Sequence, residues 1–280
     1  MTGVQTCALP IYEGQYDNMN AFFRTNGYDE VFSQEDYPVD KVVNSFGVQD
    51  DFLYDYAIPV LNQRAATGEP FFATLLSISN HPPYVIPPFF HPKTSEPETQ
   101  IVEYADWALR QFFEEARKQP WFDNTIFVLE GDHGKLVGDA ECELPESYNH
   151  IPLMIYSSRI HPEEKNTFGG QVDIQPTILG LLNIDYLQNN FGVDLLKEER
   201  PCMFYTADNM IVGRNDTLLY LYNYETQQEF TYHIDNGKLK AVPMDDRFLP
   251  LKEYSFSMLQ SAEFLVKHGK TLNSIPFTQQ

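Results

Sequence analysis

Three short runs of almost uninterrupted apolar residues constrain the fold of this chain more than any other feature. They are FFATLLSIS at Phe71–Ser79, TIFVL at Thr125–Leu129 and IPLMIY at Ile151–Tyr156. Runs of this length suit strands that are covered on both faces, as in a parallel sheet. Strand, helix and strand at this spacing predict a βαβ unit with a right-handed crossover.

The segment between the first two runs has the pattern of an amphipathic helix. Ser95 and Glu98 have the spacing of a capping box, and apolar residues then recur every three or four positions up to Pro120. Two shorter helices are predicted. One lies at Asn18–Phe23 and is followed by Gly27 as a left-handed stop, and the other lies at Asp173–Leu182. We therefore expect an α/β fold with a mostly parallel central sheet and helices on both faces.

Beyond Glu199 the sequence changes to short aromatic strands separated by turn signals. The predicted elements are strands at 203–206, 217–222 and 230–234 and a closing helix at 252–267. We expect a small antiparallel region at residues 199–280 that is added to the sheet of an α/β core at residues 12–198, because it is too short to bury a core alone.

The first eleven residues, Met1–Ile11, join no later pattern. They resemble the translated adapter sequence that contaminates assembled metagenomic reads. We therefore treat them as non-native, set them aside from the fold, and expect the gene to continue upstream.

Charge and cysteine content exclude several classes of protein. The 280 residues carry 19 Lys and Arg against 40 Asp and Glu, a net charge of −21, which disfavours nucleic acid as a partner. The three cysteines, Cys7, Cys142 and Cys202, are spaced for neither a disulfide framework nor a zinc ribbon. No apolar run has the roughly eighteen residues of a membrane span, and no signal peptide is recognisable, so we expect this chain to be soluble.

An acid and a histidine follow the second apolar run directly. Asp132 and His133 lie between Gly131 and Gly134, whose flexibility lets both side chains turn toward one ion. Ligands of open α/β sheets bind just past the carboxyl ends of the strands. A carboxylate and an imidazole suit Zn²⁺ or Mn²⁺. The simpler alternative is that Asp132 caps the next segment and His133 is a surface residue.

Two further histidines lie at strand boundaries. His81 follows the first apolar run, so the same argument places it at the same edge of the sheet. His150 precedes the third run, and a solvated histidine in a loop is the simpler interpretation of it.

At these residues the chain resembles the sulfatase-like branch of the alkaline phosphatase superfamily, specifically lipoteichoic acid synthases and related phosphoglycerol or phosphoethanolamine transferases. The resemblance covers about Tyr12–Leu195, and its most specific part is WFDNTIFV followed by DHG. The matching pieces are YDNM with AFFRTNGYD (16–29), PFFATLLSISNHPPY (70–84), YADWALRQFFEEARKQPWFDNTIFVLEGDHG (104–134), YNHIPLMIY (148–156) and QVDIQPTILGLL (171–182).

The resemblance implies a site and a cofactor. Asp132 and His133 correspond to two metal ligands of the family, and the ion would be Mn²⁺ or Zn²⁺, with Mg²⁺ as a further option. His81 and His150 correspond to residues that contact the phosphate or the leaving group. The family's nucleophilic threonine and a further carboxylate ligand lie upstream of the matching segment, so we expect the nucleophile to be missing from this chain, and Thr6 is not a substitute.

The resemblance also implies a metal-dependent phosphoryl-ester transferase or hydrolase that acts on lipid-linked or glycan phosphoesters. Turnover would pass through a phospho-threonine. The full-length protein would lie at the extracytoplasmic face of the bacterial membrane, held by an N-terminal anchor that this chain lacks. Cys7 to Pro10 does not form a formylglycine motif, so hydrolysis of sulfate esters is not supported. The alternative is a catalytically silent fold that serves as a binding module.

Overall fold

The computed structural model describes residues 4–10, 18–44, 46–136, 138–188 and 190–270. Contacts divide the chain into two compact units. Unit 1 comprises Met1–Phe127 and Ile155–Ile160, and unit 2 comprises Val128–Met154 and His161–Gln280. Each unit is described by itself below. In the described part of the chain, no helix has the length and apolar content needed to cross a bilayer.

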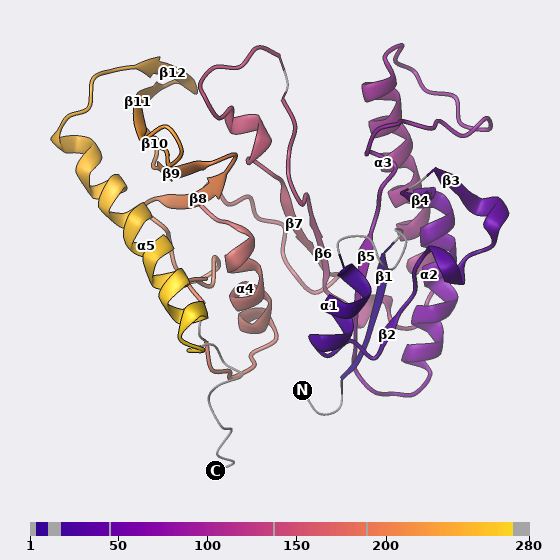
Figure 1. Cartoon of the computed structure of the whole chain (residues 1–280). Helices are drawn as coiled ribbons and strands as arrows, with labels where there is room; N and C mark the ends of the chain where they lie inside the picture. The colour runs from indigo at the N-terminus through magenta and orange to yellow at the C-terminus, as the bar shows by residue number, and fades with distance from the viewer. Residues whose placement is uncertain (1–3, 11–17, 45, 137, 189, 271–280) are drawn as a thin grey trace. The chain divides into compact units, whose positions relative to one another are not determined.

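A three-stranded parallel sheet forms the centre of unit 1 (Figure 1). Strand β1 (Gln5–Pro10) lies between β2 (Glu30–Val31) and β5 (Phe71–Leu76), and both neighbours run parallel to it. Cys7 is fully buried and pairs with Ala73 of β5. A parallel sheet is therefore present, as predicted, although β5 is the one strand of the three predicted apolar runs that lies in it among the described residues.

The central strand of this sheet lies in the segment that the sequence analysis set aside. Residues 5–10 take part in the fold, although Met1–Gly3 and Ile11 of that segment are outside the described residues, as are Tyr16 and Asp17 of the family match. Thr6 is 8% exposed, and its hydroxyl lies 2.9 Å from both the Gly27 carbonyl oxygen and Asp29 Oδ2. Excluding this segment from the fold was wrong, because Gln5–Pro10 forms the strand that pairs with both β2 and β5.

Two long helices cover the sheet of unit 1. Helix α2 (Asp50–Ala65) packs against α3 (Pro97–Ala116) and against β5. The core between them contains Leu53, Ala57 and Leu61 from α2, together with Phe112 and Ala116 from α3 and other residues. Helix α2 was not predicted from the sequence, although its buried residues recur every three or four positions.

The remaining elements of unit 1 are short. Helix α1 is Met19–Thr25, followed by Gly27 in the left-handed region at φ 92°, as the sequence predicted. Strands β3 (Val42–Asn44) and β4 (Gly47–Val48) form an antiparallel pair. The predicted capping box of α3 is absent, because the helix begins at Pro97 with Glu96 as its N-cap, one residue after Ser95.

Strands β6 (Phe127–Glu130) and β7 (Leu153–Tyr156) pair with each other. They lie where the second and third apolar runs predicted strands. Among the described residues, however, the hydrogen-bonded ladders join β6 to β7 and β5 to β1, so β5 and β6 do not share a ladder as the predicted βαβ unit required.

Unit 2 contains helix α4 (Ile174–Leu181), as predicted, preceded by a 3-10 turn at Gln171–Asp173. It also contains a five-stranded antiparallel sheet in the order β12-β11-β10-β9-β8 (Figure 1). The strands are β8 (Met203–Ala207), β9 (Met210–Arg214), β10 (Leu218–Asn223), β11 (Gln228–Asp235) and β12 (Lys238–Ala241), and helix α5 (Leu249–Lys267) packs against β8 and β9.

This antiparallel region is a sheet of its own and is not an addition to the parallel sheet. Val212, Leu219 and Leu221 are fully buried, and Leu144 from an earlier segment packs with them. Strands β9 and β12 were not predicted from the sequence, and the apolar surface they add is enough to form this separate core. The α/β class with an antiparallel C-terminal region is confirmed.

Candidate functional site

Asp132 and His133 follow β6 and face solvent. Their side chains are 75% and 72% exposed, and Asp132 Oδ2 lies 3.7 Å from His133 Nε2. His133 Nδ1 lies 2.8 Å from the Gly134 carbonyl oxygen. Because a carbonyl oxygen can only accept, this bond requires the proton on Nδ1, which leaves the Nε2 lone pair facing the carboxylate side and able to bind a metal ion.

Gly134 fastens this segment to the loop before β7. Its N–H donates to the Tyr148 carbonyl oxygen at 2.8 Å, and a Cβ at this position would lie 1.9 Å from the Ser147 carbonyl oxygen. Gly131 is less tightly packed, since a Cβ there would lie 3.3 Å from the Ile151 side chain. The final glycine of the DHG motif is therefore required by a backbone contact.

The same loop carries His150. It forms a 3-10 turn at Glu146–Tyr148, and the N–H groups of Asn149 and His150 both donate to the Glu146 carbonyl oxygen. The His150 side chain is exposed. The structure thus ties the backbone around Asp132 and His133 to the turn that immediately precedes His150.

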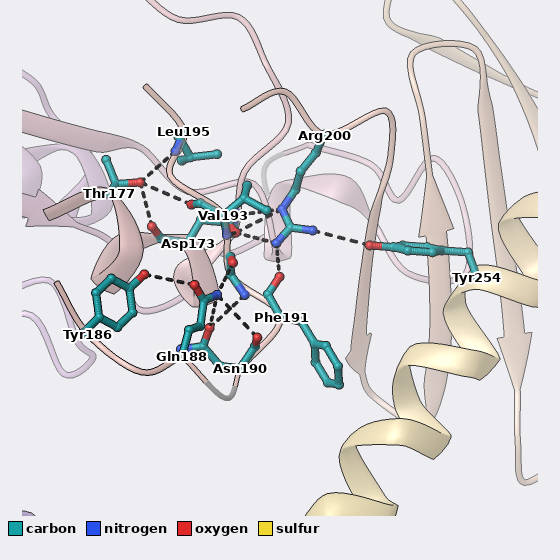
Figure 2. A network of polar contacts seen from close by, with 12 residues as sticks. Asp173, Thr177, Tyr186, Gln188, Asn190, Phe191, Val193, Leu195, Arg200 and Tyr254 are labelled. Carbon is teal, nitrogen blue, oxygen red and sulfur yellow. Dashed lines mark hydrogen bonds and ion pairs between the residues drawn. The ribbon is translucent and has the colours of Figure 1, made fainter. Parts of the chain in front are cut away.

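Gln171 holds the other side of the DHG segment. Its Nε2 donates to the Asp132 carbonyl oxygen at 2.9 Å and approaches the Gly131 carbonyl oxygen at 3.4 Å. Two residues later, Asp173 is fully buried and paired with Arg200, which is 9% exposed (Figure 2). Sequence reasoning singled out neither Gln171 nor Arg200, because their partners are 27 to 40 positions away along the chain.

His81 belongs to unit 1. Its Nδ1 lies 2.7 Å from the Pro82 carbonyl oxygen, and its ring packs on Phe46 at a centroid distance of 3.9 Å. The bond to a carbonyl again places the proton on Nδ1, so Nε2 carries the lone pair. The ring is therefore held in a fixed orientation and half-buried.

A buried aspartate orders the chain immediately before His81. Asp50 Oδ1 accepts hydrogen bonds from the backbone N–H groups of Ile78 and Ser79, and Ser79 Oγ donates to Gln49 Oε1. Burial raises the pKa of Asp50, although the hydrogen bonds from Ser79 and Ile78 oppose that rise. The N-terminus of α2 thereby fixes the end of the strand segment that carries His81.

Asp132, His133 and His150 thus share unit 2, and His81 lies in unit 1. Among the described residues, no group of three or more His, Cys, Asp or Glu is arranged to hold a metal ion. The ligand and substrate roles of these four residues stay predictions.

The donor chemistry of the Asp132–His133 pair fits a divalent cation. Two ligand atoms about 2.1 Å from one tetrahedral ion lie about 3.4 Å apart, close to the 3.7 Å observed here between Oδ2 and Nε2. A mixed carboxylate and imidazole set suits Mn²⁺ and Zn²⁺, whereas Mg²⁺ prefers oxygen ligands. This pair would supply two ligands of such an ion.

Comparison with known proteins identifies the family. The family model described as Sulfatase matches residues 2–184, well over half of the chain. The chain belongs to the sulfatase family. Its curated relatives include lipoteichoic acid synthase 1 of Bacillus subtilis, 27% identical over 247 residues, which are 80% of this chain and 37% of the relative. Lipoteichoic acid synthase 2 of the same organism is 26% identical over 65% of this chain and 31% of its own length.

Solved structures support the same fold for this sulfatase-family chain. A protein of the alkaline phosphatase superfamily from Vibrio parahaemolyticus has a TM-score of 0.81 at 26% identity, covering 93% of this chain and 66% of that one. A lipoteichoic acid synthase from Listeria monocytogenes has a TM-score of 0.79 at 21% identity, covering 99% of this chain and 72% of that one. The predicted resemblance and alkaline phosphatase-like fold are confirmed. The chain spans about a third of the length of the curated relatives it matches.

Proposed function

We propose that this sulfatase-family chain is part of a metal-dependent enzyme that transfers or hydrolyses phosphoryl esters of lipid-linked phosphoglycerol or a similar cell-envelope substrate. The observation that carries the proposal is the Asp132–His133 pair, whose exposed carboxylate and oriented Nε2 face each other at 3.7 Å. The lipoteichoic acid synthases among its relatives favour this substrate class.

In the proposed site Asp132 and His133 hold one divalent ion, Mn²⁺ or Zn²⁺. The bound ion would supply positive charge to the phosphoryl oxygens and lower the pKa of a nucleophile. That charge matters here, because a protein of net charge −21 repels an anionic ester at long range.

The histidines contribute hydrogen bonds in this proposal. His81 and His150 contact the phosphoryl oxygens, or donate a proton to the oxygen of the leaving alcohol. His81 would donate as the imidazolium, whose Nδ1–H stays on the Pro82 carbonyl oxygen and whose Nε2–H is left for the substrate, with the Phe46 ring fixing its orientation. The Gly134 contact fixes the backbone two residues before His150.

We assign the nucleophile to no residue of this chain. The Thr6 hydroxyl bonds to Gly27 and Asp29 within unit 1, so it serves the fold there. We accordingly propose that the 280-residue chain alone turns over a chromogenic phosphodiester negligibly, even with Mn²⁺. We also propose that the full-length protein works at the outer face of the bacterial membrane, where a lipid-linked envelope substrate would be found.

Imidazole resonances in NMR spectra test the proposed site, since the chain holds seven histidines. Mn²⁺ is expected to broaden His133 first. After Zn²⁺ is bound instead, glycerol phosphate is expected to shift His81 and His150 and to leave His91 and His268 unchanged.

Paired variants provide the control. Asp132→Asn with His133→Gln should abolish the Mn²⁺ effect, whereas His161→Gln, which removes another exposed histidine of unit 2, should leave it intact. A wild-type spectrum in which Mn²⁺ broadens all exposed histidines equally would exclude the metal site and favour a binding module. Robust turnover of the diester by this chain would refute the assignment of the nucleophile outside it.

A further inference from the structure

We propose that Arg214, on β9 of the antiparallel sheet, is a positioning residue that holds the turn at Glu146–Tyr148, and through it the Asp132–His133 segment and His150. The inference rests on the proposed function, because it assigns a role toward that site. By this inference the C-terminal sheet positions the proposed site through Arg214, although none of the predicted site residues lies in that sheet.

The Arg214 guanidinium is held by groups on several elements. Its Nε donates to Glu146 Oε1. One terminal nitrogen donates to the Asn215 carbonyl oxygen at 3.3 Å, and the guanidinium carbon lies 5.2 Å from the centre of the Phe168 ring, a cation–π contact. The side chains of Arg214 and Glu146 are 25% and 23% exposed, so the pair is partly shielded from water. These contacts hold the guanidinium in one orientation, so that its Nε–H stays directed at the Glu146 carboxylate in the turn.

Glu146 passes this constraint to the site. While its carboxylate accepts from Arg214, its carbonyl oxygen accepts from the backbone N–H of His150 at 2.8 Å. The next two residues of the turn touch Gly134, through the Tyr148 carbonyl oxygen and the close Ser147 carbonyl. The Arg214–Glu146 ion pair is therefore connected through this turn both to His150 and to the DHG segment.

The start of the same loop is attached independently. Leu144 is 2% exposed in the core of the antiparallel sheet, and the Tyr232 hydroxyl donates to Glu143 Oε2 at 2.5 Å. Removing the Arg214 charge should therefore loosen residues 146–150 and 131–134 while residues 141–145 stay in place. This local pattern separates positioning from general loss of stability.

Hydrogen exchange measured by mass spectrometry tests the inference in the full chain without metal. Arg214→Met keeps an apolar stem and removes the donors. It is expected to raise exchange about tenfold in peptides covering 131–134 and 146–150, with little change in 228–241. The matched control is Lys252→Met, which breaks the Lys252–Glu229 pair, 37% and 29% exposed, and touches no residue of this loop.

Rescue distinguishes a specific pair from packing. Arg214→Lys should keep part of the protection from hydrogen exchange that Arg214→Met loses. The double variant Arg214→Glu with Glu146→Arg should be better protected than either of its single variants. Unchanged exchange at 131–134 and 146–150 in Arg214→Met, or an equal rise in Lys252→Met, would overturn the inference.

Metal binding provides a second measurement. Weaker Mn²⁺ broadening of His133 in Arg214→Met than in the wild type would support a role toward the site. If Mn²⁺ does not bind the wild-type chain, the proposed function fails, whereas the exchange pattern still decides whether Arg214 positions these segments.

Discussion

Replacing Arg200 with methionine should destabilise unit 2 far more than removing an exposed charge such as that of Lys197. The Arg200 Nε lies 3.0 Å and 2.9 Å from the two carboxylate oxygens of Asp173, and one terminal nitrogen donates to the same carboxylate and to the Phe191 carbonyl oxygen (Figure 2). The other terminal nitrogen lies 3.4 Å from the Tyr254 hydroxyl oxygen. Without Arg200, the fully buried Asp173 carboxylate loses the cation beside it and is left with backbone hydrogen bonds from the Gly170 and Val193 N–H groups.

The expected cost follows from burial. Breaking a buried pair by removing one partner costs about 3–5 kcal/mol, because a charge is left buried without compensation. With a slope of about 2 kcal/mol per molar urea, the unfolding midpoint should fall by about 1.5–2.5 M. The matched control is Lys197→Met, whose partner is Asp194. Lys197 is 67% exposed, so that loss should be under about 1 kcal/mol and about 0.5 M.

Circular dichroism in urea measures both variants. A double change, Arg200→Met with Asp173→Asn, should recover part of the stability because it leaves no buried charge. If the midpoint of Arg200→Met falls no further than that of Lys197→Met, the pair contributes little and the reasoning from burial is refuted.

Two further predictions follow from the same structure. Gly134→Ala should lower the free energy of unfolding by about 2–3 kcal/mol, because its Cβ meets the rigid Ser147 carbonyl oxygen at 1.9 Å. Gly131→Ala should cost less, because its Cβ meets the flexible Ile151 side chain at 3.3 Å. Thermal unfolding compares the two variants, and equal melting temperatures would contradict the prediction. As pH rises above about 4, the free energy of unfolding of Asp50→Asn should increase relative to that of the wild type, because the wild type alone loses stability. Burial raises the pKa of Asp50 in the folded chain, so the unfolded chain releases this proton first and the wild type loses stability with increasing pH. Urea midpoints of both proteins from pH 4 to 7 test this, and a constant difference would exclude the raised pKa.

The apolar runs were sufficient to predict the α/β class and the positions of β5, β6 and β7. Helix α2 was missed because its apolar residues are spread around the helix instead of marking one face, since Phe52, Tyr56 and Ile58 also pack on the core, and because Pro59 lies inside it. The antiparallel sheet was underestimated because β9 and β12 were not predicted and because its core also includes Leu144, which lies more than fifty residues before the first strand of that sheet. Local periodicity does not encode contacts of this range.

Prediction of the site was limited in the same way. The sequence singled out Asp132, His133, His81 and His150, because apolar strands deliver polar residues to strand ends. It gave no indication of Arg214, whose partner Glu146 is 68 positions away. A charged residue at the end of a strand, as Arg214 is in β9, is ordinarily solvated, so only the tertiary structure distinguishes it.

The DHG motif combines two physical requirements. The first two residues offer a carboxylate and an imidazole at 3.7 Å, and the proton on His133 Nδ1 is directed to the Gly134 carbonyl oxygen. The third residue lacks a side chain because the Ser147 carbonyl occupies the space of a Cβ. Since the glycine also bonds to Tyr148, the proposed ligand pair cannot move independently of the turn that leads into His150. A substitution at Gly134 should therefore disturb His150 as well as His133, although neither side chain is changed.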